Sequence, residues 1–382
     1  MLLDLYELLA MKICSVGVAC SKRKDQCISK LLTLSFRWSW LKRSGSLNAS
    51  SGRCFSYAKP QTDVRPSRIA LDLQDPKFIT VQAKNPALDF ASCDPEHLSP
   101  ATCKVANLVG GVWTYDPASH CIIVDPLTGK PMMSVADVKP HETAPFVAAL
   151  RACPKYGLHN PLRRVERYRT YGDVCAAAAA ALGEPVVARF FARLIQRVSP
   201  KSYQQAMGEV TVTRAFLHNF SGDQVRFLAR SFGTPGDHLG QSTQGYRWPY
   251  GPVAIITPFN FPLEIPALQL LGALFMGNKP LLKVDQKVSV VMEQFLRLLL
   301  RCGMPPDDAA FMHCSGAVAH SLLLEARPRN TVFTGSSRVA DILARDLHGR
   351  IKVEGAGFDW KIVGPMQHEL RSAAAAAAAA AA

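Results

Sequence analysis

The chain has 382 residues, a hydrophobic content of 48% and a formal net charge of +14. A chain this long and apolar can bury one large core or two moderate ones, which excludes wholesale disorder. The basic charge does not indicate a nucleic-acid partner, because its distribution is uneven. The first 60 residues carry ten Lys or Arg against three acidic residues, and this difference is half of the net positive charge of the chain.

This N-terminal segment, "KRKDQCISKLLTLSFRWSWLKRSGSLNASSGRCFSYA", is rich in Arg, Lys and Ser and poor in acids. Such a composition is typical of a mitochondrial presequence. We therefore expect residues 1–55 to be an import signal, with cleavage before Ser56, and the mature protein to lie in the mitochondrial matrix. A basic tail or a surface helix is the alternative. Asp4 and Glu7 fit a presequence poorly, so translation from Met11 stays open.

No stretch approaches the roughly 18 uninterrupted apolar residues of a membrane span, so no membrane contact is expected. The eleven cysteines contain no CxxC pair and no zinc-type spacing. We expect inert thiols in a reducing compartment and no metal site.

The first half of the chain alternates short strands with longer helices. Turn-flanked strands are predicted within 107–117 and 122–132, helices within 141–157, 162–183 and 185–198, and a polar, Gly-rich hairpin at 231–248. The Arg run from Arg163 to Arg169 is interpreted as a solvated helix face, with phosphate binding as the alternative.

After Tyr250 the pattern becomes strictly alternating. Strands are predicted at 252–259, 279–284, 309–314, 330–335, 350–355 and 359–364, with helices at 263–278, 288–302, 316–326 and 336–349. Repeated strand–helix units predict an α/β fold, in which a Rossmann-like parallel sheet is flanked by helices. Ligands of such sheets bind at the carboxyl ends of the strands.

Four predicted strand ends carry residues that could take part in binding or catalysis. In "ITPFNFP", Asn260 stands before a Pro-restricted turn, where its amide could donate to a developing oxyanion or simply cap the next helix. Lys283 could reach a ribose or phosphate, or lie along the surface. In "FTGSS", Gly335 and Ser336 open a helix whose free N–H groups favour a pyrophosphate, although Gly-Ser capping is common. Neither GxGxxG nor GxxxxGK[ST] occurs.

The fourth strand end is Glu354, followed by Gly355, Ala356 and Gly357. Small neighbours allow close approach of a ligand, so this carboxylate could act as a general base. A surface Glu in a turn is the alternative.

The order of these motifs, "TPFNFP", "GNKPLLK", "FTGS" and a strand-end Glu before a Gly-rich turn, resembles the aldehyde dehydrogenase superfamily over residues 107–365. The segments at 246–294 and 354–362 look like its plant-type mitochondrial Δ1-pyrroline-5-carboxylate dehydrogenase branch, in which "EGAGF" replaces the commoner "ELGGK".

This resemblance implies NAD (NADP possible) as cofactor and glutamate 5-semialdehyde, in equilibrium with pyrroline-5-carboxylate, as the aldehyde substrate. It implies two catalytic residues, the oxyanion-hole amide of Asn260 and the general base Glu354. It implies a cofactor cleft lined by Thr257, Pro258, Phe259, Lys283, Gly335 and Ser336. Gln286 stands where many relatives have a ribose-binding Glu, which leaves the choice between NAD and NADP open.

The resemblance also divides the chain. It implies an N-terminal extension at 56–106, a cofactor-binding domain in two parts at 107–230 and 249–365, an oligomerisation hairpin at 231–248 and a low-complexity tail at 366–382. A homo-oligomer is expected of a full-length protein.

The family's nucleophilic Cys lies some thirty residues beyond the general base, in a domain that follows it. No Cys follows Cys314 in this chain, and neither Cys302 nor Cys314 has the nucleophile's context. Three hypotheses follow: an incomplete record of an ordinary enzyme, a noncatalytic nucleotide-binding or regulatory subunit, or a product that cannot fold properly. The first is preferred, and the polypeptide as written is expected to lack aldehyde oxidation.

Overall fold

The computed structural model describes residues 85–158, 166–229 and 231–357. The presequence, most of the N-terminal extension, the first residues of the helix predicted at 162–183, the strand predicted at 359–364 and the C-terminal tail lie outside these ranges.

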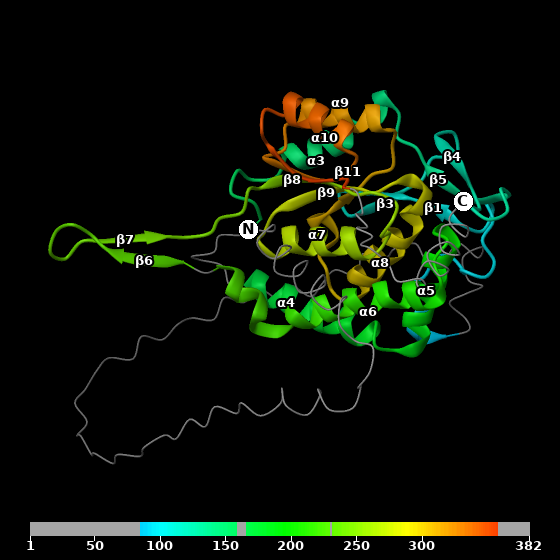
Figure 1. Cartoon of the computed structure of the whole chain (residues 1–382), viewed down its shortest axis with the longest axis horizontal. Coiled ribbons are helices and arrows are strands. Elements are labelled where there is room, and N and C mark those ends of the chain that lie inside the picture. The colour runs from blue at the N-terminus through cyan, green and yellow to red at the C-terminus, as the bar shows by residue number, and fades with distance from the viewer. Residues whose placement is uncertain (1–84, 159–165, 230, 358–382) are drawn as a thin grey trace, which may run out of the picture. The chain divides into compact units, whose positions relative to one another are not determined.

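A seven-stranded sheet organises the described part of the chain (Figure 1). Its strands, in spatial order, are β12 (Ile351–Gly355), β11 (Asn330–Gly335), β8 (Pro252–Ile256), β9 (Lys279–Lys283), β10 (Ala310–Phe311), β2 (Asn107–Val109) and β3 (Val112–Thr114). Strands β8 to β12 are parallel, and β2 and β3 extend the sheet as an antiparallel pair. The predicted α/β fold with a parallel sheet is confirmed.

The chain fills this sheet from the middle. From β8 it moves to β9 and β10 on one side, and then returns to place β11 and β12 on the other side of β8. The order reverses between β8 and β11, which is the switch point where doubly wound sheets open a crevice at their carboxyl ends.

Helices cover both faces of the sheet (Figure 1). On one face lie α3 (Ala144–Arg151), α9 (Gly316–Ala326) and α10 (Ser337–Asp346), and on the other lie α7 (Glu264–Phe275) and α8 (Ser289–Arg301). Outside α7 and α8 is a further layer of α4 (Glu166–Ala181), α5 (Pro185–Val198) and α6 (Tyr203–Asn219).

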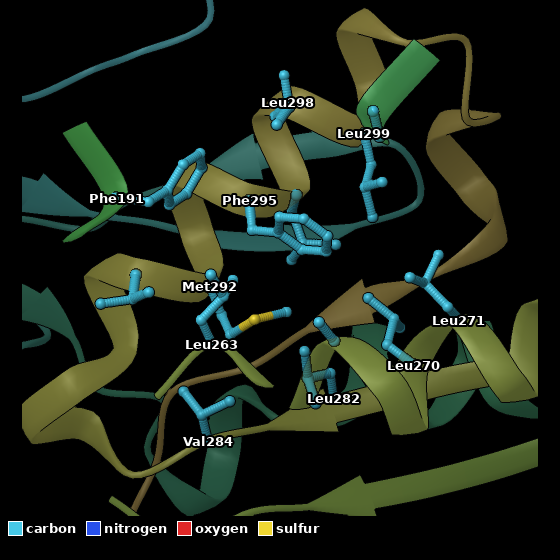
Figure 2. Packing of buried hydrophobic residues seen from close by; sticks show 14 of the residues in the cluster. Phe191, Leu263, Leu270, Leu271, Leu282, Val284, Met292, Phe295, Leu298 and Leu299 are labelled. Carbon is cyan, nitrogen blue, oxygen red and sulfur yellow. The ribbon is translucent and has the colours of Figure 1, made fainter. Parts of the chain in front are cut away.

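Strand alternation distributes the apolar side chains between these layers. Along β8, Val253 and Ile255 join the large core beneath the sheet, whereas Ala254 faces the α10 side. Figure 2 shows how α5, α7, α8 and β9 interlock in the large core through Phe191, Leu263, Leu270, Leu271, Leu282, Val284, Met292, Phe295, Leu298 and Leu299.

Helix α6 was not predicted from the sequence. Its start carries a capping box, in which the Ser202 hydroxyl accepts from the Gln205 N–H and the Gln205 side chain accepts from the Ser202 N–H. That motif was the signal that could have identified it.

The remaining elements lie around the sheet. A second sheet consists of β1 (Lys104–Val105), β5 (Pro131–Ala136) and β4 (His120–Val124), and a hairpin consists of β6 (Phe232–Pro235) and β7 (Ser242–Gly245). The described 3-10 turns are η2 (Pro86–Leu88), η3 (Pro140–Glu142), η4 (Gly222–Ala229), η5 (Gln286–Val288) and η6 (Pro306–Asp308). The hairpin is almost wholly exposed. It matches the predicted position, and its oligomerisation role stays a prediction.

The expectation of a solvated Arg face on α4 was wrong for Arg167. Its guanidinium donates to the Asp308 carboxylate at 2.7 Å and lies over the Tyr171 ring, with only 14% of the side chain exposed. Arg163 and Arg164 lie outside the described residues.

Within the described ranges no single helix is long and apolar enough to span a bilayer. Helices α4 and α5 reach the length and hydropathy of a membrane span only when they are taken together, and this pair is bent by 85°. Their buried apolar side chains belong to the large core.

Candidate functional site

The parallel strands bring the predicted residues to one edge of the sheet. Ile256 at the end of β8 pairs with Lys283 on β9 and with Phe333 on β11. One strand further, Thr334 pairs with Glu354. The carboxyl ends of four strands therefore surround the switch point between β8 and β11.

Asn260 lies in the loop that leaves β8, and its side chain is exposed. The alternative role as a helix cap is not supported. Helix α7 has Leu263 at its N-cap position, with no side-chain cap bond from that residue. Phe259 and Phe261, on either side of Asn260, are 60% and 41% exposed, and Pro258 is half-buried. The loop thus presents an amide and two rings at this edge of the sheet.

Glu209 caps α7 instead, and sequence reasoning missed it. Its carboxylate is 1% exposed and accepts hydrogen bonds from the N–H groups of Leu263 at 2.8 Å and Glu264 at 3.1 Å. Its second oxygen pairs with the Lys201 ammonium at 3.0 Å, and that ammonium lies 4.0 Å from the Phe261 ring centroid. Helix α6 therefore anchors the end of the loop that carries Asn260. Burial and the charge of Glu209 raise the pKa of Glu264.

Gly335 is the last residue of β11, and Ser336 connects it to α10. Ser336 occupies the N-cap position in extended conformation, and its side chain makes no capping bond, so the first N–H groups of α10 are not satisfied by it. Those groups and the helix dipole attract an anion. A side chain at position 335 would begin 2.7 Å from the Phe333 ring, which explains the glycine.

Glu354 is exposed, but a hydrogen bond to its carboxylate fixes the direction of the side chain. The Thr334 hydroxyl lies 3.3 Å from Oε2 of Glu354 and accepts a hydrogen bond from Nε2 of Gln269 at 2.9 Å. Because the amide of Gln269 donates to this hydroxyl, the hydroxyl proton is free to point at the carboxylate. This chain from α7 through β11 to β12 directs the Glu354 carboxylate, and neither Gln269 nor Thr334 was predicted.

Lys283 is half-buried at the end of β9, where its ammonium donates to the Val284 carbonyl at 3.3 Å. Nearby, the Gln286 amide donates to the Asp137 carboxylate at 3.1 Å, so a carboxylate from the end of β5 lies beside Gln286. Ammonium and amide groups at adjacent positions suit the hydroxyl and phosphate oxygens of a nucleotide.

His313, which follows β10, is a buried residue of this region that sequence reasoning also missed. Oδ1 of Asn107 accepts from both the N–H and Nδ1 of His313, at 2.8 and 3.0 Å, which places the imidazole proton on Nδ1. Burial, reinforced by the positive charge of Lys283, lowers the pKa of His313 to about 3. The ring is therefore neutral at physiological pH.

Because the His313 imidazole is buried in its neutral form, we expect the stability of the fold to be sensitive to acid. Because the folded-state pKa is depressed, the stabilisation is complete above the unfolded-state value of about 6.5 and is lost as the pH falls toward 3. We expect the free energy of unfolding to fall by about 2 kcal/mol between pH 8 and pH 5 from this residue. Urea unfolding at both pH values measures it. His313→Gln should remove most of that difference, and an unchanged pH dependence would contradict the assignment.

Six of the seven described cysteines have thiols with a raised pKa. Burial raises the pKa of Cys302 and of Cys314 to about 11 and that of Cys175 to about 12, and raises it for Cys93, Cys121 and Cys153. For Cys93, the larger cause is the hydrogen bond between its thiol and the Cys103 side chain, which stabilises the protonated thiol. A nucleophilic thiolate needs a lowered pKa, so none of these six thiols suits that role.

The edge fits a dinucleotide. The Thr257 hydroxyl, on a residue that is 3% exposed, has no hydrogen-bond partner among the described residues. A buried polar atom without a partner is costly unless a ligand or water satisfies it. Val339 and Ala340 donate their N–H groups to the Ser336 carbonyl, which leaves the Ser337 and Arg338 N–H groups at the start of α10. Together with these two groups and the Lys283 ammonium, the Thr257 hydroxyl offers donors to a ribose and a pyrophosphate on both sides of the switch point.

Comparison with known proteins agrees with this geometry. Residues 113–382 match the sequence profile of the aldehyde dehydrogenase family. The chain is 59% identical over 293 residues to "Delta-1-pyrroline-5-carboxylate dehydrogenase 12A1, mitochondrial" of Arabidopsis thaliana, which covers 76% of this chain and 52% of that protein. It is 62% identical over 284 residues to a "Probable aldehyde dehydrogenase" of Linum usitatissimum, covering 74% and 51% respectively.

The fold also matches a crystal structure of an NAD-dependent aldehyde dehydrogenase from Sinorhizobium meliloti. The TM-score is 0.58 at 22% identity, over 72% of this chain and 52% of that one. The chain spans about half the length of the curated relatives that it matches. The match to the family profile, together with these relatives, shows that the chain belongs to the aldehyde dehydrogenase family.

Proposed function

We propose that this chain provides the cofactor-binding half of an NAD-dependent aldehyde dehydrogenase of proline catabolism, which oxidises L-glutamate 5-semialdehyde to glutamate. The observation that carries the proposal is the carboxyl edge of the sheet, where the neighbouring ends of β9, β8 and β11 carry Lys283, Thr257 and the Gly335–Ser336 turn. The similarity to the Arabidopsis protein supports the substrate. The name of that relative also supports a mitochondrial location, for which the matrix is our proposal.

Each residue has a distinct proposed part. Lys283 holds the adenosine ribose, the N–H groups after Gly335 hold the pyrophosphate, and Thr257, Pro258 and Phe259 line the cleft. When bound, the nicotinamide supplies a hydride acceptor. Residues 231–248 form part of a homo-oligomer contact in a full-length protein.

The reacting aldehyde carbonyl lies between Asn260 and Glu354 in this proposal. The Asn260 amide stabilises the oxyanion that forms when a thiolate attacks the carbonyl. The Glu354 carboxylate, held by Thr334 and through it by Gln269, removes a proton from the thiol or from the water that hydrolyses the thioester. Exposure leaves this carboxylate free to reach water.

We propose NAD as the cofactor, with NADP as the alternative. The Asp137 carboxylate contacts Gln286, the position that the resemblance assigns to the ribose, and it is also paired with the Lys139 ammonium. Because the ammonium offsets the carboxylate charge, this pair does not by itself exclude the 2′-phosphate of NADP.

Replacing Lys283 with alanine tests the site. We expect the dissociation constant for NAD⁺ to rise about tenfold, which corresponds to a lost charge-assisted hydrogen bond of about 1.4 kcal/mol. Calorimetric titration of the full chain with NAD⁺, and in parallel with NADP⁺, measures this. Exposed Lys287→Ala, four positions along, is the matched control and should bind NAD⁺ normally. Equal affinities of the Lys283 and Lys287 variants would contradict the site.

A second candidate function is a noncatalytic nucleotide-binding or regulatory subunit. The six described thiols with raised pKa are compatible with both candidates, because the resemblance places the family's nucleophile in the domain that follows the general base. We expect the purified 382-residue polypeptide to bind NAD⁺ without forming NADH when glutamate semialdehyde is added, as followed by NADH absorbance. Thiol-dependent NADH formation by this polypeptide would contradict that expectation.

A further inference from the structure

A second cleft lies at the opposite edge of the sheet, and the proposed dehydrogenase function does not use it. It has a volume of about 1170 Å³ and is lined by Pro154, Lys155, Tyr156, Gly157, Leu158, Trp248, Pro249, Tyr250, Arg329 and Arg350. We call it the amino-end cleft, because Arg329 and Arg350 immediately precede β11 and β12 and Tyr250 precedes β8. A five-residue strand rises about 3.3 Å per residue, so roughly 17 Å of β8 separates this cleft from the cofactor edge.

The lining is basic. Three cations, Lys155, Arg329 and Arg350, line the cleft, and no carboxylate is among the lining residues that the structure describes. Among the described residues none of the three forms an ion pair; Arg350 donates to the Leu347 carbonyl at 3.1 Å, and Lys155 lies over the Tyr156 ring. Cations that converge without a counter-charge favour an anionic ligand.

The sheet fixes the backbones of the two arginines. The Arg350 carbonyl accepts from the Thr331 N–H at 2.9 Å, and the Arg329 N–H donates to the Pro252 carbonyl at 2.8 Å. The two Arg residues thus start neighbouring strands, with fixed backbones. A ligand with several anionic oxygens can contact both, which suits a polyphosphate better than a single carboxylate.

Three aromatic side chains also line the cleft. Tyr156, Trp248 and Tyr250 are 61%, 42% and 53% exposed, and the rings of Tyr156 and Trp248 lie 6.0 Å apart. Two contacts fix the backbone beside these rings: the Leu158 N–H donates to the Gly277 carbonyl at 2.8 Å, and the Tyr250 N–H donates to Oδ1 of Asn278 at 2.7 Å. Exposed rings on a fixed backbone offer stacking to a planar group.

We propose that the amino-end cleft binds a nucleoside polyphosphate, with its phosphates on Arg329, Arg350 and Lys155 and its base against Tyr156 and Trp248. The volume exceeds the roughly 300–1,000 Å³ of ordinary ligand sites, so a nucleotide fits. This site is distinct from the cofactor edge and would let nucleotide concentration act on the protein independently of the cofactor.

The test uses ATP as the probe on the full chain, with Trp248 fluorescence as a local readout and calorimetry for affinity. We expect ATP to change the fluorescence. Arg329→Ala and Arg350→Ala should each weaken ATP binding by about tenfold or more, as expected for a lost charge-assisted bond. Arg345→Ala, an exposed Arg on α10 that lies outside the cleft, is the matched control. Trp248→Phe should abolish the fluorescence change while ATP still binds.

Further probes test each half of the assignment. Tripolyphosphate should bind at least fivefold more weakly than ATP. Tyr156→Ala, at an exposed position where the substitution does not threaten folding, should lower the affinity for ATP to that for tripolyphosphate. Equal affinity for tripolyphosphate and ATP would overturn the nucleoside assignment. Affinity that rises with the length of a single-stranded oligonucleotide would instead indicate a nucleic-acid surface. ATP binding that is insensitive to Arg329, Arg350, Tyr156 and salt would overturn the proposal altogether.

Discussion

Replacing Asn260 with alanine is expected to lower kcat about 10²–10³-fold in a catalytically complete protein, the usual effect of losing one oxyanion-hole donor. A chimera supplies that protein: residues 1–365 of this chain followed by the corresponding remainder of the Arabidopsis relative. The KM for the aldehyde should change little, because the lost interaction forms in the transition state.

Folding should survive this substitution, since the Asn260 side chain is exposed and does not cap α7. Asn219→Ala, at the exposed end of α6, is the matched control and should leave kcat unchanged. A chimera that keeps full kcat with alanine at 260, or loses it equally in both variants, would contradict the assigned role.

Replacing Glu209 with alanine is expected to lower the free energy of unfolding by about 3–5 kcal/mol, the cost of breaking a buried ion pair and leaving its partners unsatisfied. Two N–H groups at the start of α7 and the Lys201 ammonium would lose their acceptor together. The loop that carries Asn260 ends at this anchor, so cofactor binding should weaken as well.

Denaturant unfolding of the full chain measures this loss. Glu325→Ala is the control: its carboxylate is 54% exposed and 3.9 Å from Arg151, so its removal should cost at most about 1 kcal/mol. Losses of similar size in the two variants would show that Glu209 does not anchor α7.

The parallel sheet, and the edge at which the candidate residues lie, could be predicted because strand–helix alternation is a local pattern in the sequence. Lys283, Gly335 and Glu354 each follow an apolar run, and parallel topology brings such positions to one edge without further information. The strand order itself, including the addition of β2 and β3, was not predictable, because pairing depends on contacts between distant segments.

The residues that support the edge were missed for the same reason. Glu209 lies 54 residues from Leu263, Gln269 lies 65 from Thr334, and Asn107 lies 206 from His313. Nothing in the local sequence distinguishes these polar side chains from helix-surface or loop residues. Only tertiary packing buries them and gives each its partner.

The central claim is a dinucleotide site at the switch point between β8 and β11, and a crystal structure of the full chain grown with NAD⁺ tests it most directly. We predict density for the dinucleotide between β8 and β11, with the pyrophosphate at the N–H groups after Gly335 and the ribose at Lys283. Density for NAD⁺ in the amino-end cleft alone, with the β8–β11 edge empty, would contradict it.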